Sequence, residues 1–390
     1  MRDRTWGFLI AVCALVGGLG GCGEDDPEPD GDADADSDAD ADGDGDGDGD
    51  ADGDGDSDCD PGPACEPADD DYRPREGDPD DEPYADCVAD DGDYHPFNPE
   101  SISTIARVAA FETIADLLWR GGTPTIDDFT NALTEYSTAE GLESRLSRRE
   151  DVHYPPVEID GEEVQCRDLT PDQQAENAER CVGPALIQPI LNDAFDAGIA
   201  GEDPEVNAAR IEAALVWFLY VSSHKELSTC VGSQGDCDSG WAYFTGGHQR
   251  DETQLGLAAY VQALEAETFD RAFDGVLAVD CWDDLDPPAG DPPARSNLEL
   301  RDLAISQLDR ALLRGVALIV IARLEALSTA EGTERAAWAF LEVLGPVLDR
   351  EATARDGAAA GRLAAAWAAG PDAIDVEATT CDLETVFHCP

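Results

Sequence analysis

Apolar residues recur every three or four positions along most of the chain after residue 94, which is the period of amphipathic helices. The first such stretch, 102–118, is followed by Gly121-Gly122, a pair that commonly ends a helix. The most apolar stretch begins at Asp203-Pro204, an N-cap residue followed by a first-turn proline, and we expect it to run to about Thr229. The same period predicts further helices that open at Thr125 and Thr170, and others at about 251–265, 268–281, 298–327, 333–352 and 357–369.

A few segments depart from the helical period. Residues 157–164 alternate apolar and polar side chains around a central Asp-Gly, which predicts a small β-hairpin. Pro189 and Gly345-Pro346 should kink or break their helices, and the Pro- and Asp-rich residues 286–297 should form a loop. We therefore expect residues 94–390 to form an all-α domain, either one multi-helix bundle or two abutting bundles, with one small β-hairpin.

The N-terminus has the pattern of an export signal. Two arginines precede an apolar run that ends at Leu19 and is too short to span a bilayer. Leu19-Gly20-Gly21-Cys22 resembles the lipobox of bacterial lipoproteins, which implies that residues 1–21 are a signal peptide and that Cys22 is acylated. The same resemblance, with Gly23 rather than aspartate after the cysteine, implies an outer-membrane lipoprotein that faces either the periplasm or the outside. The alternative is an ordinary secreted protein with a cysteine at the cleavage site by chance.

Residues 22–93 are predicted to form a long disordered tether. Every even-numbered position from Asp30 to Asp60 is aspartate, separated mostly by Gly, Ala or Ser, so the segment has nothing to bury and repels itself. Residues 44–49 copy the opening of an EF-hand calcium loop, but strict alternation never places a carboxylate at the twelfth loop position. We therefore identify no cofactor and expect only loose binding of divalent cations to the tether.

The charge balance limits the kinds of partner. The chain carries 87 acidic residues against 24 basic ones, a net charge of −63. Nucleic acids and anionic lipid surfaces are bound through patches of Lys and Arg, so neither is an expected partner. We expect membrane attachment through the lipid anchor and a protein or small-molecule partner of unspecified identity. A high-salt habitat or a need for solubility explains the acidity equally well.

The cysteine count favours disulfides. Two of the 12 cysteines, Cys13 in the signal and Cys22 at the lipidation site, leave ten in the mature chain. An even number in an exported protein favours disulfides over metal sites. Closeness in sequence predicts the pairs Cys166–Cys181, Cys230–Cys237 and Cys381–Cys389, while Cys281 is expected to bond to Cys59, Cys65 or Cys87.

One stretch of the helical region is a candidate site. Lys225 is the only lysine of the chain, and an ammonium group is not interchangeable with a guanidinium group. One hypothesis is a ligand-binding pocket between helices, lined by Lys225, Glu226, Trp241, Tyr243, His248, Arg250 and Glu252. In the alternative interpretation, Lys225 compensates the dipole at the end of its helix and pairs with Glu226, while His248 lies in a loop or first turn.

Residues 246–251 (Gly-Gly-His-Gln-Arg-Asp) resemble the G-x-H-x-x-E motif of imelysin-like proteins, with aspartate at the last position. The resemblance implies a helical surface lipoprotein that handles iron or another metal, with His248 and Asp251 as the metal-binding pair. No hydrolase signature or phosphate-binding glycine loop is present. The leading hypothesis is therefore a non-enzymatic, lipid-anchored protein with a helical ligand- or partner-binding domain. The alternatives are the imelysin-like role and a hydrolase that uses Lys225 or His248.

Overall fold

The computed structural model describes residues 65–74, 83–99, 102–138, 141–231, 233–290, 294–329 and 333–390. They belong to one compact unit, which spans Asp56–Pro390. The predicted signal peptide, the lipidation site at Cys22 and the Asp-rich repeat lie outside the described residues.

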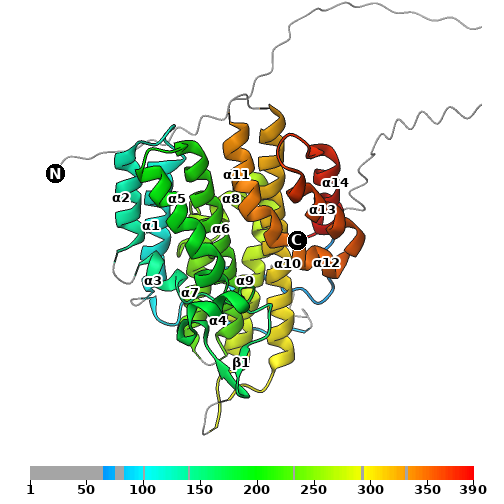
Figure 1. Cartoon of the computed structure of the whole chain (residues 1–390). Coiled ribbons are helices and arrows are strands. Elements are labelled where there is room, and N and C mark those ends of the chain that lie inside the picture. Colours follow the sequence, from blue (N-terminus) through cyan, green and yellow to red (C-terminus); the bar gives the residue numbers. More distant parts are fainter. Residues whose placement is uncertain are drawn as a thin grey trace, which may run out of the picture. The chain divides into compact units, whose positions relative to one another are not determined.

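Helices provide almost all the regular structure of this unit (Figure 1). In chain order they are α1 (Ser103–Leu118), α2 (Ile126–Tyr136), α3 (Leu142–Leu146), α4 (Pro171–Glu176), α5 (Gln188–Ile199), α6 (Pro204–Thr229), α7 (Gln234–Thr245), α8 (Gly256–Leu264), α9 (Ala266–Leu285), α10 (Leu298–Thr329), α11 (Glu334–Leu344), α12 (Asp349–Arg355), α13 (Gly357–Ala369) and α14 (Val376–Phe387). Short helical turns and two antiparallel strands complete the elements: η1 (Val88–Asp91), η3 (Cys166–Asp168), η4 (Gly183–Ile187), η5 (Gly345–Leu348), β1 (Val157–Ile159) and β2 (Glu162–Val164). The all-α fold with one small hairpin is confirmed.

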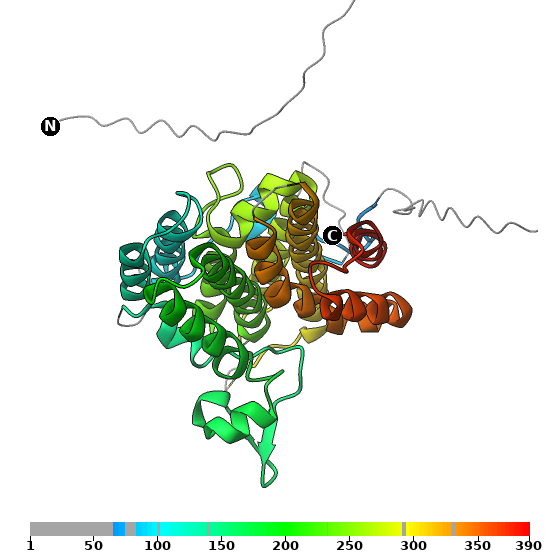
Figure 2. The ribbon, with the colours of Figure 1, turned by 45° about the horizontal axis from the view of Figure 1, so that its top comes forward.

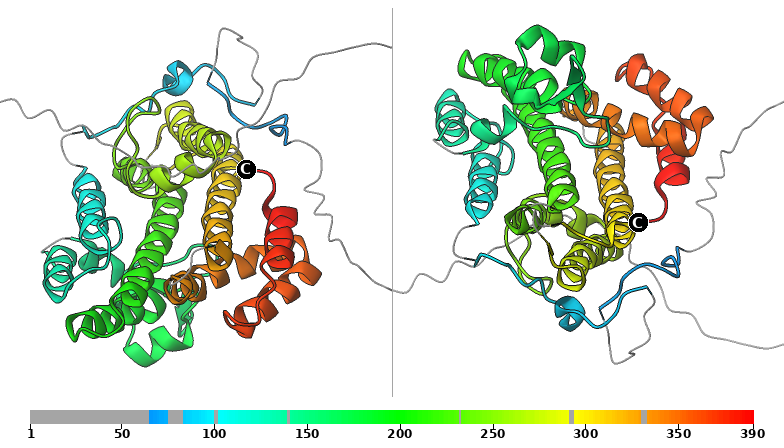
Figure 3. Two further views of the ribbon diagram at one scale, coloured as in Figure 1. Left: turned by 90° about the horizontal axis from the view of Figure 1, so that it is seen from above. Right: turned by 90° about the horizontal axis from the view of Figure 1, so that it is seen from below.

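One continuous hydrophobic core joins the helices, so the domain is a single bundle rather than two abutting ones. The long helices α6 and α10 run through its middle (Figures 1 and 3). Helix α6 packs against α5, α7 and α11, and α10 packs against α9, α11 and α14. The hairpin and α4 project from the side of the bundle over a small cluster of their own (Figure 2). No helix in the described part of the chain is both long and apolar enough to cross a membrane.

Helices α9 and α10 are in close contact at Gly275. A Cβ atom on this residue would lie 2.6 Å from the Cα and 2.8 Å from the backbone nitrogen of Leu308. Backbone atoms cannot move aside as a flexible side chain can, so the contact requires glycine at this position.

Local signals in the sequence set the ends of several helices. The Thr125 hydroxyl accepts the Asp128 N–H at 3.3 Å, and the Asp128 carboxylate accepts the Thr125 N–H at 2.8 Å, which is the predicted capping box. Gly345-Pro346 breaks the predicted helix 333–352 into α11, η5 and α12. The helix predicted over 251–265 begins only at Gly256, because the preceding loop satisfies its own polar groups, among them the Gln249 N–H.

The predicted boundary of the tether at residue 93 lies too far along the chain. Residues 65–74 and 83–99 pack onto the helical domain, where Tyr72, Tyr84 and Tyr94 are almost fully buried. Acidic composition suggested a solvated segment, but these interspersed tyrosines bury enough apolar surface to hold it in place.

Disulfides fasten this segment to the helices. Cys87 bonds to Cys281, and Cys65 bonds to Cys389. The predicted pairs Cys166–Cys181 and Cys230–Cys237 are confirmed, as is the expectation that Cys281 joins one of the three N-terminal cysteines. The predicted pair Cys381–Cys389 is wrong. Most of the chain from Cys381 to Cys389 belongs to α14, and at the rise of a helix these positions lie about 12 Å apart, which is too far for a disulfide. Cys381 is disulfide-bonded, but not to Cys389, which bonds to Cys65.

Candidate functional site

The structure divides the predicted pocket residues into two groups. Lys225, Glu226 and Tyr243 gather around Arg149, whose Nη1 atom lies 2.6 Å from Glu226 Oε1. The Lys225 ammonium lies 3.1 Å from Glu226 Oε2, and the Arg149 guanidinium lies 5.2 Å from the centre of the Tyr243 ring. Burial opposes the charge of Arg149, but Glu226 and Tyr243 outweigh it and raise the pKa of the guanidinium. This cluster is a buried ion-pair network that ties the segment after α3 to α6 and α7.

The second group lies at and after the end of α7. Trp241 stacks on Tyr94, with ring centres 4.6 Å apart. His248 lies in the loop that follows α7, and its backbone N–H donates to the Thr245 hydroxyl. Arg250 forms ion pairs with Asp270 and Asp274 of α9, while the Glu252 carboxylate accepts the Gln249 N–H at 2.7 Å.

These placements favour the alternative interpretation of the stretch, because Lys225 pairs with Glu226 and His248 lies in a loop. Arg250 and Asp251 line a small hollow of about 420 Å³, together with several aspartates. The metal-binding pair of His248 and Asp251 remains a prediction.

A different site lies on the other side of α6. A groove of about 660 Å³ runs between η4, α5 and α6 on one side and α11, η5 and α12 on the other, and residues of the loop 151–154 close one part of it. Its apolar lining consists of Val182, Leu186, Ile190, Trp217, Val343, Pro346 and Val347. Its polar lining consists of Asp151, His153, Tyr154, Glu179, Tyr220, Glu342, Asp349, Arg350 and Thr353.

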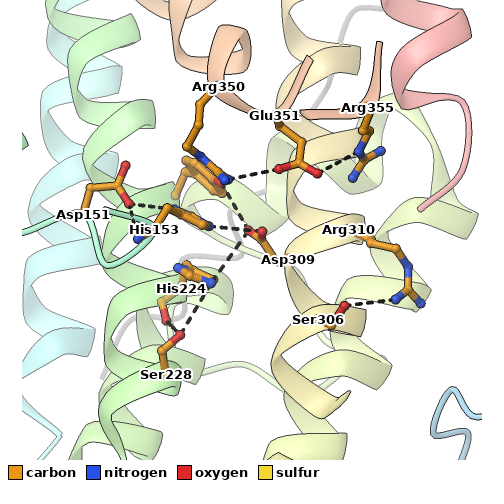
Figure 4. A network of polar contacts seen from close by, with 11 residues as sticks. Asp151, His153, His224, Ser228, Ser306, Asp309, Arg310, Arg350, Glu351 and Arg355 are labelled. Atoms are coloured by element: carbon orange, nitrogen blue, oxygen red, sulfur yellow. Dashed lines mark hydrogen bonds and ion pairs between the residues drawn. The ribbon is translucent and has the colours of Figure 1, made fainter. Parts of the chain in front are cut away.

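A histidine pair stands behind this groove. His153 on the loop and His224 on α6 stack face to face, with ring centres 3.9 Å apart and planes 7° apart. Asp309 of α10 faces both rings, and its carboxylate lies 3.1 Å from His153 Nε2 and 3.9 Å from His224 Nε2. Figure 4 shows the three side chains converging from three separate elements.

Neighbouring groups orient this cluster. Asp151 Oδ1 lies 2.6 Å from His153 Nδ1, so both nitrogens of that ring face carboxylates. The Tyr220 hydroxyl donates to Asp309 Oδ1 at 3.2 Å. The Ser228 hydroxyl, one turn further along α6, lies 3.5 Å from His224 Nε2.

The two histidines have opposite protonation preferences. Burial opposes protonation of His153, but its hydrogen bonds to Asp151 and Asp309 raise its pKa from 6.5 to about 9. Burial lowers the pKa of His224 from 6.5 to about 4, against the attraction of Asp309. Burial would raise the pKa of the Asp309 carboxyl, but its contacts with the histidines hold that pKa well below its ordinary value. At neutral pH the stack therefore contains one imidazolium and one neutral imidazole.

This cluster was not predicted from the sequence. Tyr220, His224 and Ser228 recur every four residues on α6, so they share one helix face, and Asp151 stands two residues before His153. Those local spacings were available signals. Asp309 had none, because it meets His153 across 156 residues of chain.

No family model matches the chain, and no curated protein or solved structure was found to be significantly similar to it. The function is therefore argued from the chemistry of the site.

Proposed function

We propose that this protein is an exported, lipid-anchored binding protein whose helical domain takes up a small amphipathic cation in the groove lined by Trp217. The observation that carries this proposal is the groove itself, because a concave site with an apolar wall and a few fixed polar groups is the usual form of a small-molecule site.

The export half of the proposal rests on the lipobox-like residues 19–22 and on the disulfides. Bonds such as Cys87–Cys281 persist in oxidising compartments, which agrees with an extracytoplasmic location. Mass spectrometry of the mature protein tests this half. We expect an N-terminal residue at Cys22 carrying acyl chains, and a free thiol at this residue or a different N-terminus would contradict it.

The charge of the groove points to a cation. The two positive groups in its lining already face carboxylates: Arg350 lies 3.2 Å from Glu351, which Arg350 shares with Arg355, and His153 lies between two carboxylates. Glu179 and Glu342 are exposed on the same lining, and Glu342 is partly compensated by Arg210 at 4.0 Å, so the remaining charge of the lining is negative. An ammonium group entering the groove would be attracted by both carboxylates.

The apolar wall accounts for the rest of the ligand. Trp217 is half-buried and lines the groove beside aliphatic side chains. An indole ring binds both an apolar body and, through its face, a cationic head. A ligand with an ammonium group on a short hydrocarbon or aromatic body matches both features.

Two probes of similar shape and opposite charge test the groove. We expect protonated phenethylamine to bind the full mature chain in isothermal titration calorimetry and 3-phenylpropanoate to bind much more weakly. Glu179→Gln and Trp217→Ala should each weaken phenethylamine binding by about threefold or more. Lys225→Gln is the matched control, because Lys225 is not part of the groove lining, and it should leave binding unchanged. Equal binding of the two probes, or no effect of Trp217→Ala, would overturn the proposal.

A further inference from the structure

We propose that His153, His224 and Asp309 form a binding site for a divalent transition-metal ion of the zinc type. The imidazole nitrogens and the carboxylate oxygen that they offer all lie within 4.8 Å of one another. The three ligands come from the loop 151–154, α6 and α10, so they are held by different parts of the packed core rather than by one flexible segment.

The charge of the cluster suits a dication. With both imidazoles neutral, Asp151 and Asp309 carry a charge of about −2 in a largely buried setting, which the nearby Arg350 offsets only in part, and a bound cation would compensate the rest. A bound dication would neutralise the two carboxylates at once.

The neighbours of the three ligands are those expected around a metal. Asp151 accepts from Nδ1 of His153 at 2.6 Å, which directs Nε2 of the same ring toward Asp309. A carboxylate on the far nitrogen of a ligand histidine is a typical supporting contact in zinc sites. The Tyr220 hydroxyl fixes Asp309 in the same way.

One adjustment is required for a single ion to meet both rings. Parallel rings stacked at 3.9 Å cannot both direct a lone pair at the same point, so one of them must turn. His153 is held at both nitrogens, whereas the contact of His224 Nε2 with the Ser228 hydroxyl is long, at 3.5 Å. His224 is therefore the ring that turns about its side-chain torsions when the ion binds.

The ligand set identifies the class of ion and leaves one position open. Two imidazoles with one carboxylate suit zinc and similar ions, whereas calcium and magnesium prefer oxygen ligands alone. Zinc sites with three protein ligands keep a fourth position for water or a ligand group. Since His153 also lines the groove, that fourth position would face it.

The other candidate group, Cys65, His388 and Cys389, offers no thiolate pair because its two cysteines are bonded to each other.

Cobalt(II) titration of the full mature chain tests the proposal, since the visible absorption of this ion distinguishes four-coordinate nitrogen sites from hydrated or all-carboxylate ones. Calcium is added in excess so that it, rather than cobalt, occupies the aspartates of the N-terminal repeat. We expect one equivalent of cobalt to give an intense four-coordinate spectrum, and one equivalent of zinc to displace it. His224→Phe and Asp309→Asn should each abolish the spectrum, with folding of each variant checked by circular dichroism without metal.

Two matched histidine variants complete the design. His95→Gln removes a surface histidine that pairs with Asp91, and it should leave the spectrum unchanged. Loss of the spectrum in His248→Ala instead of His224→Phe would overturn the proposal in favour of the loop after α7. No tight site in the wild-type chain, or a site that survives in both His224→Phe and Asp309→Asn, would also overturn it. Trp217→Ala should leave cobalt binding intact, so a failure of the metal-site proposal can be distinguished from a failure of the amine-binding proposal.

Discussion

His153 and His224 stack with ring centres 3.9 Å apart although 71 positions separate them in the chain numbering. The contact joins the loop 151–154 to α6, and Asp309 extends it to α10. Because two imidazolium rings at this distance would repel each other, the stack accommodates one proton and resists a second. The stability of the domain should therefore depend on pH in a way that these two residues determine.

On the acid side, His224 should determine how the stability of the domain changes with pH. Its pKa is lowered to about 4 in the fold, while the unfolded chain takes up the proton near pH 6.5. Between these values the unfolded state binds more protons, so stability falls as pH falls. We expect the unfolding free energy of the wild type, relative to His224→Phe, to drop by roughly 1 kcal/mol per pH unit from pH 6.5 to 4. Urea unfolding of both proteins across this range measures it, and parallel curves would contradict it.

On the alkaline side, His153 should determine how the stability of the domain changes with pH. Its pKa is raised to about 9 in the fold, so its contribution is fully present below about pH 6.5 and is lost as pH rises through 9. We expect the stability advantage of the wild type over His153→Gln to shrink by roughly 1 kcal/mol per pH unit between pH 6.5 and 9. The same urea titrations test this, and an advantage that grows toward pH 9 would be the opposite of the expected result.

The buried pair of Arg149 and Glu226 should matter more to stability than the neighbouring lysine. Glu226→Gln removes the carboxylate that compensates a buried guanidinium, and we expect a loss of about 3 kcal/mol in the free energy of unfolding. Lys225→Gln removes a more exposed partner of the same carboxylate, and we expect less than about 1 kcal/mol. Chemical denaturation of the two variants compares them directly. A larger loss for Lys225→Gln would restore that lysine as a residue of special importance.

Two disulfides should differ in their contribution to stability. Cys87–Cys281 closes a separation of 194 residues, whereas Cys230–Cys237 closes one of 7. Chain-entropy estimates give about 5 and about 2 kcal/mol for the two. We expect the double serine variant of the first pair to lower the melting temperature by clearly more than that of the second, in thermal unfolding followed by circular dichroism. Equal losses would mean that strain or residual structure outweighs loop length.

Two glycines should respond in opposite directions to alanine. At Gly275 the added methyl group meets the backbone of Leu308, and we expect Gly275→Ala to destabilise the domain by about 1–3 kcal/mol. Gly361 is exposed inside α13 with nothing within 4 Å of its Cβ position, so Gly361→Ala should stabilise by up to about 1 kcal/mol. Urea denaturation of both variants tests the pair, and destabilisation by Gly361→Ala would contradict the account of α13.

Much of the fold could be predicted because its signals are local. The capping box at Thr125, the Asp203-Pro204 start of α6 and the break at Gly345-Pro346 depend on residues a few positions apart. The packing of residues 65–74 and 83–99 could not be predicted in this way. It depends on disulfides that cross up to 324 residues and on tyrosines in an otherwise acidic stretch.

The candidate site shows the same limit. The rarity of Lys225 drew attention to the end of α6, but its ammonium only pairs with the adjacent Glu226. His224, its immediate neighbour, instead faces Asp309 of α10. Packing between α6 and α10 places His224 rather than Lys225 in the cluster. No local pattern in a single sequence predicts that contact.

An anomalous difference map at the zinc edge, from crystals of the full mature chain grown with one equivalent of zinc, would locate the metal site directly. We expect a single strong peak bounded by Nε2 of His153, Nε2 of His224 and the carboxylate of Asp309, beside the groove. A map without a peak at this position, or with the ion at His248, would contradict it.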